Sequence, residues 1–241
     1  MLTNEKILNS PLEIDATVLK LVALIAMTVD HIGYFILPEI AELRIVGRLA
    51  YPIFAYMIVE GCEHTKNKLR YFLNVLGVGL VCSAASFWAE GSLYQSIMIT
   101  FACAILLIFA IKHVVAASRI GCTLRADAAK LAAVLLTVLV YCLASGKITP
   151  GLQVDYGFLG IATPVLAALG QSRLQRLLLL SVGLALLSFS MGGVQIFSLA
   201  ALCLLALYNG RRRYGAGIAK GVFYAYYPLH LAVIYGIAQM T

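Results

Sequence analysis

The stretch VLKLVALIAMTVDHIGYFILP, Val18–Pro38, decides the fold class of this chain. It is apolar over the length that a helix needs to cross the hydrocarbon core of a bilayer, about 20 residues. Two adjacent ionisable residues, Asp30 and His31, interrupt it well inside its ends. Because ionisable groups at that depth are costly, they are functional-site candidates by default. The stretch therefore predicts a membrane helix that carries part of a site.

The composition extends this interpretation to the whole chain. Of its 241 residues, 62% are hydrophobic and only 12% are charged, and the mean hydropathy is +0.93. A soluble globule needs more polar surface than this. Long uniformly apolar runs favour helices, because barrel strands would alternate over about ten residues. We expect one membrane domain over residues 1–241, with residues 1–17 as a charged cytoplasmic segment and no cleavable signal peptide.

Apolar runs and basic residues together predict the topology. Nine candidate spans cover residues 18–38, 44–62, 69–89, 95–115, 128–145, 156–170, 174–190, 192–208 and 221–240. With the N-terminus inside, all Lys and Arg residues except Lys147, Arg44 and Arg48 fall at the cytoplasmic side, as the positive-inside rule requires. We therefore expect an all-α integral membrane protein, a polytopic helical bundle of about nine transmembrane helices, N-in and C-out.

The net charge and the cysteines exclude other classes. A net charge of +7 is explained by basic loops that touch lipid headgroups, so no nucleic-acid partner is expected; some of these cations could also bind the phosphates of a cytoplasmic cosubstrate. The six cysteines lie in or beside apolar runs without metal-ligand spacing, and they are expected to be packing residues. We expect no metal site, and we expect a multi-pass protein of the bacterial cytoplasmic membrane.

Helix geometry separates the two ionisable residues of the first span. Asp30 and His31 point about 100° apart, so a direct relay between them is not expected. Tyr34 lies within reach of either on the helix surface. Arg48, in the next span, lies at a depth comparable to that of Asp30. We expect Asp30 to contact Arg48, either in a site or as a structural ion pair.

The second span carries a polar residue every fourth position. Arg44, Arg48, Pro52, Tyr56, Glu60 and His64 form this series. Four residues overshoot a helical turn by about 40°, so the series winds slowly along one face. We expect that face to line a cavity. Pro52 cannot bond to the carbonyl of Arg48, which predicts a kink beside that charge. The alternative is that the charges are structural ion pairs.

Two further segments hold polar residues at unusual positions. In the last span, His230 lies near mid-bilayer with Tyr226 and Tyr227 one turn away. It could line a site or be a satisfied core histidine. In the outer loop, Asp155 and Tyr156 lead into the sixth span. Asp155 could cap that helix or contact a substrate.

These motifs together resemble the TraX family. They are Asp30-His31-Ile-Gly, then Arg44-Ile-Val-Gly-Arg48-Leu-Ala-Tyr-Pro with Glu60-Gly and His64-Thr, then Asp155-Tyr156-Gly-Phe-Leu-Gly, and last Phe223-Tyr-Ala-Tyr-Tyr227-Pro-Leu-His230. The resemblance runs from Lys20 nearly to the C-terminus. It implies a membrane acyltransferase that uses acetyl-CoA as donor and an extracytoplasmic or membrane-embedded amine or hydroxyl as acceptor, such as a pilin N-terminus or a cell-surface component.

The implied chemistry assigns roles to these residues. Acetyl transfer needs a base for the nucleophile and a group that stabilises the oxyanion. His31 is the expected base and His230 the alternative. Arg48, Tyr34 or Tyr227 could stabilise the oxyanion, with Asp30 holding Arg48. The substrate and CoA contacts are expected among Arg44, Tyr56, Glu60, His64, Asp155 and Tyr156, with the CoA nucleotide on inner-face cations.

Two other functions are also compatible with the sequence. Ionisable residues inside a bundle also suit a small ion-coupled transporter, although no repeated half is detectable in the sequence. A non-enzymatic assembly factor for a pilus or a surface polymer would use the polar face to hold a partner helix.

Overall fold

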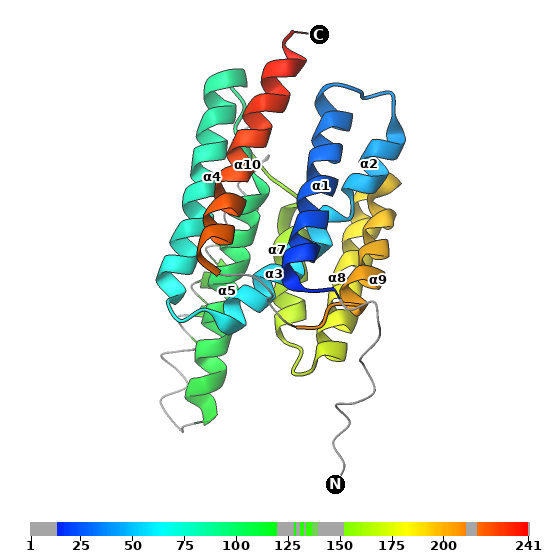
Figure 1. Ribbon diagram of the computed structural model, residues 1–241. Coiled ribbons are helices and arrows are strands. Elements are labelled where there is room, and N and C mark those ends of the chain that lie inside the picture. The colour runs from blue at the N-terminus through cyan, green and yellow to red at the C-terminus, as the bar shows by residue number, and fades with distance from the viewer. Residues whose placement is uncertain are drawn as a thin grey trace.

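A computed structural model describes residues 14–119, 152–210 and 216–240, together with a few residues between 128 and 138. The described chain is an elongated bundle of helices (Figure 1). Most of the expected span at 128–145 lies outside the described residues. So do several basic loop residues on which the predicted orientation rests, among them Arg125, Lys147 and Arg211.

The helices follow one another with short connections. They are α1 (Ala16–Phe35), α2 (Ala41–Gly47), α3 (Ala50–His64), α4 (Lys68–Glu90), α5 (Ile97–Arg119), α7 (Gly157–Ala168), α8 (Arg173–Met191), the 3₁₀ helix η2 (Gly193–Ala200), α9 (Ala201–Ala206) and α10 (Ala216–Ala238). Two short strands, β1 (Tyr94–Gln95) and β2 (Gln153–Val154), pair in parallel.

Local sequence signals set several helix starts. The Asp15 carboxylate accepts from the backbone N–H groups of Thr17 and Val18 and caps α1. Asn67 caps α4 in the same way, and Ser172 opens α8 with a capping box. These caps lie at the ends of apolar runs. The polar residue that precedes each apolar run therefore determines where the helix begins.

Within the described part of the chain, six helical segments are long and apolar enough to cross a membrane. They are Ala16–Phe35, Ala41–His64, Lys68–Ala89, Ile97–Ala116, Arg173–Met191 and Gly221–Ala238. The expected span 156–170 is only the 12-residue α7. The expected span 192–208 is η2 followed by α9; because a 3₁₀ helix rises about 2.0 Å per residue, the two together reach about 25 Å. Both fall short of the expected helix length.

The second span is broken where the sequence predicted a kink. Helix α2 ends at Gly47 and α3 begins at Ala50. Pro52 is the third residue of α3, and it has no N–H to donate to the carbonyl of Arg48. The turn at Arg48 and Leu49 therefore carries the break. It lies inside the bundle, which places a guanidinium at a helix interruption.

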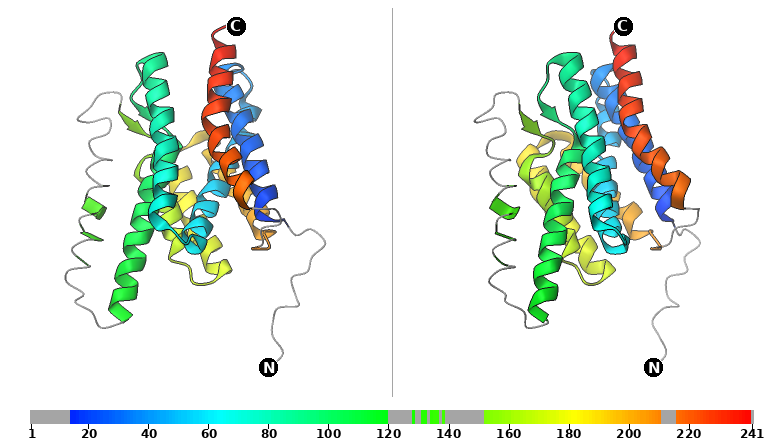
Figure 2. Two further views of the ribbon diagram at one scale, coloured as in Figure 1. Left: turned by 60° about the vertical axis from the view of Figure 1, so that its left-hand side comes forward. Right: turned by 90° about the vertical axis from the view of Figure 1, so that its left-hand side faces the viewer.

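Helix α3 forms the centre of the bundle and α10 lies at its edge. Tyr56, Ile53 and Val59 of α3 are fully buried, packed with Phe101 of α5 and Leu184 of α8 among others. Helix α10 packs against α1 and α4 (Figure 2). The start of α1 and the end of α10 lie at opposite ends of the bundle (Figure 1).

Candidate functional site

The carboxylate of Asp30 joins α1 to the break in the second span. Its Oδ1 lies 2.6 Å from Nη2 of Arg48, and its Oδ2 lies 2.7 Å from Nη1 of Arg44. The carboxylate packs directly against Gly47, where an added Cβ would collide with it. The predicted contact between Asp30 and Arg48 is confirmed, and Arg44 is a second partner.

Arg48 is buried, with 7% of its surface exposed, and it donates in four directions. Besides Asp30, its Nη1 donates to the Tyr156 hydroxyl at 3.2 Å and to Oε1 of Gln195 at 3.1 Å. Its Nε donates to the carbonyl of Arg44 at 3.2 Å. A buried guanidinium is stabilised when its donors are satisfied in this way. Gln195 was missed from sequence; the only available signal was one amide within an apolar stretch.

His31 and His230 form a hydrogen-bonded pair between α1 and α10. Nδ1 of His31 lies 2.8 Å from Nε2 of His230, and the rings stack with centroids 5.0 Å apart. The sequence treated these two histidines as alternative bases. Because they lie 199 positions apart, nothing in either motif indicated that they touch. The structure instead makes them one unit, close to the Asp30 cluster.

The neighbours of this pair fix its proton positions. Nδ1 of His230 lies 2.9 Å from the carbonyl of Tyr226, and a carbonyl only accepts, so that nitrogen carries the proton. With both imidazoles neutral, Nε2 of His230 accepts and Nδ1 of His31 donates. Nε2 of His31 then has a lone pair, and it has no hydrogen-bond partner among the described residues. This arrangement leaves Nε2 of His31 able to accept a proton or a hydrogen bond, and His230 orients the ring through Nδ1 of His31.

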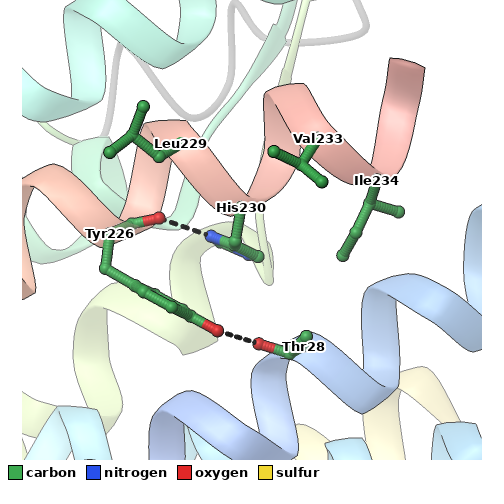
Figure 3. A pocket seen from close by; sticks show the side chains of 6 residues that line it. All are labelled: Thr28, Tyr226, Leu229, His230, Val233 and Ile234. Atoms are coloured by element: carbon green, nitrogen blue, oxygen red, sulfur yellow. Dashed lines mark hydrogen bonds between the residues drawn. The ribbon is translucent and has the colours of Figure 1, made fainter. Parts of the chain in front are cut away.

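An apolar groove lies beside the pair, between α1 and α10 (Figure 3). Its volume is about 320 Å³, and it is lined by Thr28, Tyr226, Leu229, His230, Val233 and Ile234. Thr28 donates to the carbonyl of Leu24, so the Tyr226 hydroxyl donates to Thr28 across the groove, at 2.7 Å. These bonds join α10 to α1 at the level of the histidines.

The loops before α5 and before α7 meet at Asp155. Its Oδ1 accepts from the Tyr94 hydroxyl at 2.5 Å, and its carbonyl accepts from Thr100 at 2.8 Å. Burial raises the pKa of Asp155 to about 6, although the Tyr94 hydrogen bond and Arg48 act in the opposite direction. The alternative in which Asp155 caps the next helix is wrong, because Tyr156 is the N-cap of α7 and no side chain bonds there.

A second ionic cluster lies at the other end of α3. Arg176 contacts Glu60 and Glu63, each at 3.1 Å, and Lys112 contacts Glu63 at 2.8 Å. His64 is exposed, and its ring lies 3.8 Å from Glu60. Twelve residues separate Arg48 from Glu60, about 18 Å along a helix. The expected site residues therefore divide into one set near the start of α3 and another near its end.

Two expectations about individual residues are corrected. Tyr56, which was expected to line a cavity with the rest of the polar face, is instead 1% exposed and packed in the apolar core between the two ionic clusters. Tyr34 does not bond to Asp30 or His31 within the described residues. It is exposed, and the Arg44 guanidinium lies over its ring, 5.1 Å from the centroid. Tyr227 is buried with its ring edge-on to His230.

Within the described ranges there is no group of three or more metal-ligating side chains. Cys62 and Cys82 are buried free thiols, Cys103 is half-buried and Cys203 is exposed. The packing role expected for the cysteines therefore fits Cys62 and Cys82 best. Cys122 and Cys142 lie outside the described residues.

Comparison with known proteins gives one match over nearly the whole chain and two local ones. The family model of the TraX protein matches residues 15–238. An uncharacterized protein, RP591, of Rickettsia prowazekii (strain Madrid E) is 53% identical over 38 residues, 16% of this chain and 15% of the relative. The probable fimbrial assembly protein FimC, serogroup H1, of Dichelobacter nodosus is 32% identical over 81 residues, 32% of this chain and 33% of the relative.

The two local matches cover less than two thirds of either relative's length. No solved structure matches the chain. The family match includes every residue of the Asp30 cluster and both histidines of the pair. Its extent leaves no doubt about membership, and the chain belongs to the TraX family.

Proposed function

We propose that this protein is a membrane acetyltransferase that moves the acetyl group of acetyl-CoA to an amine or hydroxyl of an extracytoplasmic or membrane-embedded acceptor. The observation that carries the proposal is the hydrogen-bond polarity of the histidine pair, which leaves Nε2 of His31 unprotonated inside a membrane bundle. A neutral imidazole with a free lone pair is the usual general base of acyl transfer. Membership of the TraX family supports the same reaction class through the resemblance already described.

The reaction balances with the groups in place. Nε2 of His31 takes the proton of the acceptor as its oxygen or nitrogen bonds to the acetyl carbon. The C–S bond then breaks, and the CoA thiolate takes the proton back from His31. His230 accepts from Nδ1 of His31 and orients the ring. The ion pair with Asp30 fixes the guanidinium of Arg48 near the histidine pair. Its positive charge is therefore in position before the reaction begins.

The topology that we propose places this centre in the outer half of the membrane. Nine spans with the N-terminus inside would agree with the opposite ends reached by α1 and α10 (Figure 1). His31 lies four residues before the end of α1, about 6 Å along the helix. Arg176 and Lys112 would lie at the cytoplasmic face, where Glu60 and Glu63 already bind them. The CoA nucleotide would have to compete with these carboxylates.

Thiol release tests the proposal. Purified protein in detergent is mixed with acetyl-CoA and a peptide amine or glycerol as acceptor, and free CoA is measured with a thiol reagent. We expect turnover by the wild type and a loss of about 10²-fold or more in His31→Ala, the range for a general base. His113→Ala, which changes an exposed histidine near the end of α5, is the matched control and should keep wild-type turnover. Equal turnover of His31→Ala and wild type would refute the role of His31.

A second function, assembly of fimbriae or pili without catalysis, is favoured by one finding. The Dichelobacter relative is named a probable fimbrial assembly protein. The two functions are separable, because an assembly factor would support surface fibres when His31 is replaced by Ala. Loss of fibres in His31→Ala, with normal amounts of protein in the membrane, would favour the acetyltransferase.

A further inference from the structure

Two buried polar groups of η2 lack partners, and one of them belongs to Gln195, which contacts Arg48. Nε2 of Gln195 and Oγ of Ser198 make no hydrogen bond to any described residue. Gln195 is 2% exposed and Ser198 is fully buried. An unpaired buried donor is costly, so native structures rarely keep one without a reason. Both residues belong to η2, where side chains three positions apart lie on the same edge because a 3₁₀ helix has three residues per turn.

The orientation of the Gln195 amide follows from its partner. Arg48 has donors only, so the atom that meets its Nη1 must be Oε1 of Gln195. The two N–H groups of the amide are therefore turned away from Arg48. The Tyr156 hydroxyl accepts from the same Nη1, and its own proton has no acceptor among the described residues. The residues that accept from Nη1 of Arg48 therefore both keep unused donors, the N–H groups of Gln195 and the hydroxyl of Tyr156.

The charges in direct contact favour an acceptor with negative character. Arg44 and Arg48 share a single carboxylate, that of Asp30. Two guanidinium groups thus contact one carboxylate. The excess positive charge of this contact and the unused donors of Tyr156 and Gln195 suit a carbonyl oxygen that becomes an oxyanion. Arg48 itself is occupied by Asp30, Tyr156, Gln195 and the Arg44 carbonyl. Arg48 therefore orients the donors of Tyr156 and Gln195, and its positive charge contributes to the electrostatic potential at the oxygen that they would bind.

From this arrangement we propose that the Gln195 amide and the Tyr156 hydroxyl bind the acyl oxygen of the donor and stabilise the oxyanion of the tetrahedral adduct. This inference rests on the proposed acetyl transfer, and it adds a residue, Gln195, to the machinery. As the nucleophile bonds to the acyl carbon, the C=O π pair moves onto the oxygen between these donors. This electron pair re-forms the C=O bond when the C–S bond breaks and the thiolate leaves, so no further reactant is needed.

The test uses a donor analogue that binds without reacting. S-acetonyl-CoA carries a ¹³C-labelled ketone one methylene group further from the sulfur than the thioester carbonyl. The infrared band of this ketone moves to lower frequency when its oxygen accepts hydrogen bonds. Gln195→Glu keeps an oxygen for Arg48 and nearly the same shape, but its carboxylate has no N–H donor. Gln239→Leu, at an exposed residue past the end of α10, is the matched control.

We expect a band shift in the wild type and in Gln239→Leu, and a band close to that of free analogue in Gln195→Glu. With acetyl-CoA, we expect kcat to fall by about 10²–10³ in Gln195→Glu while KM changes less than about 3-fold, as for loss of one oxyanion donor. Tyr156→Phe should give a smaller loss in the same direction.

The proposal falls if the wild-type band is unshifted, if Gln195→Glu gives the same shift, or if Gln195→Glu keeps its kcat. These outcomes differ from a failure of acetyl transfer itself. A shifted band with no turnover of acetyl-CoA would retain the oxygen site and refute the transfer. No binding of S-acetonyl-CoA together with no turnover of acetyl-CoA would refute both.

Discussion

Adjacent residues serve different contacts in this protein. Asp30 binds two arginines of the second span, while His31 bonds to His230 of the last helix. Successive residues on a helix point about 100° apart, and this divergence separates the two contacts. The ionic contact and the histidine pair therefore start from two adjacent positions of α1. A change at Asp30 would release Arg48 without directly removing the hydrogen bond of His31.

Asp155 gives the residue-scale prediction, which concerns pH. Its pKa in the folded protein is raised to about 6 from an ordinary value near 3.8, so the folded state binds a proton more tightly than the unfolded state. Its contribution to stability therefore falls as pH rises from about 4 to about 6. Asp155→Asn keeps an oxygen for the Tyr94 hydroxyl and cannot ionise. We expect its melting temperature to exceed that of wild type at pH 7.5, and the difference to shrink at pH 4.5.

The comparison of the two proteins isolates this one group, because all other carboxylates titrate in both. The melting temperature is measured in the same detergent at both pH values. A difference between Asp155→Asn and wild type that stays constant across the two pH values would contradict the raised pKa of Asp155.

At the scale of elements, close approach of α1 and α2 holds the ionic cluster together. Leu43 of α2 lies against Gly33 of α1, and Asp30 lies against Gly47. Glycine permits these contacts because it has no Cβ. The short α2 can therefore bring Arg44 close to the carboxylate, and the break that follows turns Arg48 to the same carboxylate. Packing at two glycines thus positions a site formed by longer side chains.

Gly47→Ala tests this packing. The new methyl would collide with the Asp30 carboxylate and push it from Arg48, so we expect the free energy of unfolding to fall by about 1–3 kcal/mol, the usual cost of overpacking. Gly77→Ala in α4 is the matched control. No atom lies within 4 Å of an added Cβ there, so this change should be neutral or stabilising, by up to about 1 kcal/mol. Reversible unfolding in mixed micelles measures both; equal stability of the two variants would contradict the close contact.

At the scale of the whole molecule, the ends of the described bundle lie on opposite sides (Figure 1). With the N-terminus inside, we expect alkaline phosphatase fused after Thr241 to be active and a fluorescent protein fused there to be dark. Fusions at Asn67, in the turn between α3 and α4, should give the reverse result. A C-terminal reporter active only in the cytoplasm would contradict the odd number of spans.

The sequence predicted the features that depend on local pattern. Apolar length indicated α1, α4, α5, α8 and α10, and Pro52 indicated the break beside Arg48. The equal depth of Asp30 and Arg48 predicted their contact. The sequence did not predict that α10 packs against α1 at the two histidines. Periodicity shows which face of a helix is polar, but it does not show which helix packs there. Gln195 was missed because no spacing marks a single buried amide. The expected span 192–208 was predicted too long, because η2 and α9 together have too few residues to match a membrane-crossing helix.

The tautomer of His31 is the most direct test of the account, because base catalysis requires a lone pair on Nε2. The chain has four histidines, so ¹⁵N-histidine labelling gives few signals, and His31→Gln assigns the pair. Solid-state NMR of the protein in lipid bilayers should show a protonated Nδ1 and an unprotonated Nε2 for His31, with Nδ1 of His31 coupled to Nε2 of His230. A protonated Nε2 and an unprotonated Nδ1 on His31 at neutral pH would contradict the account.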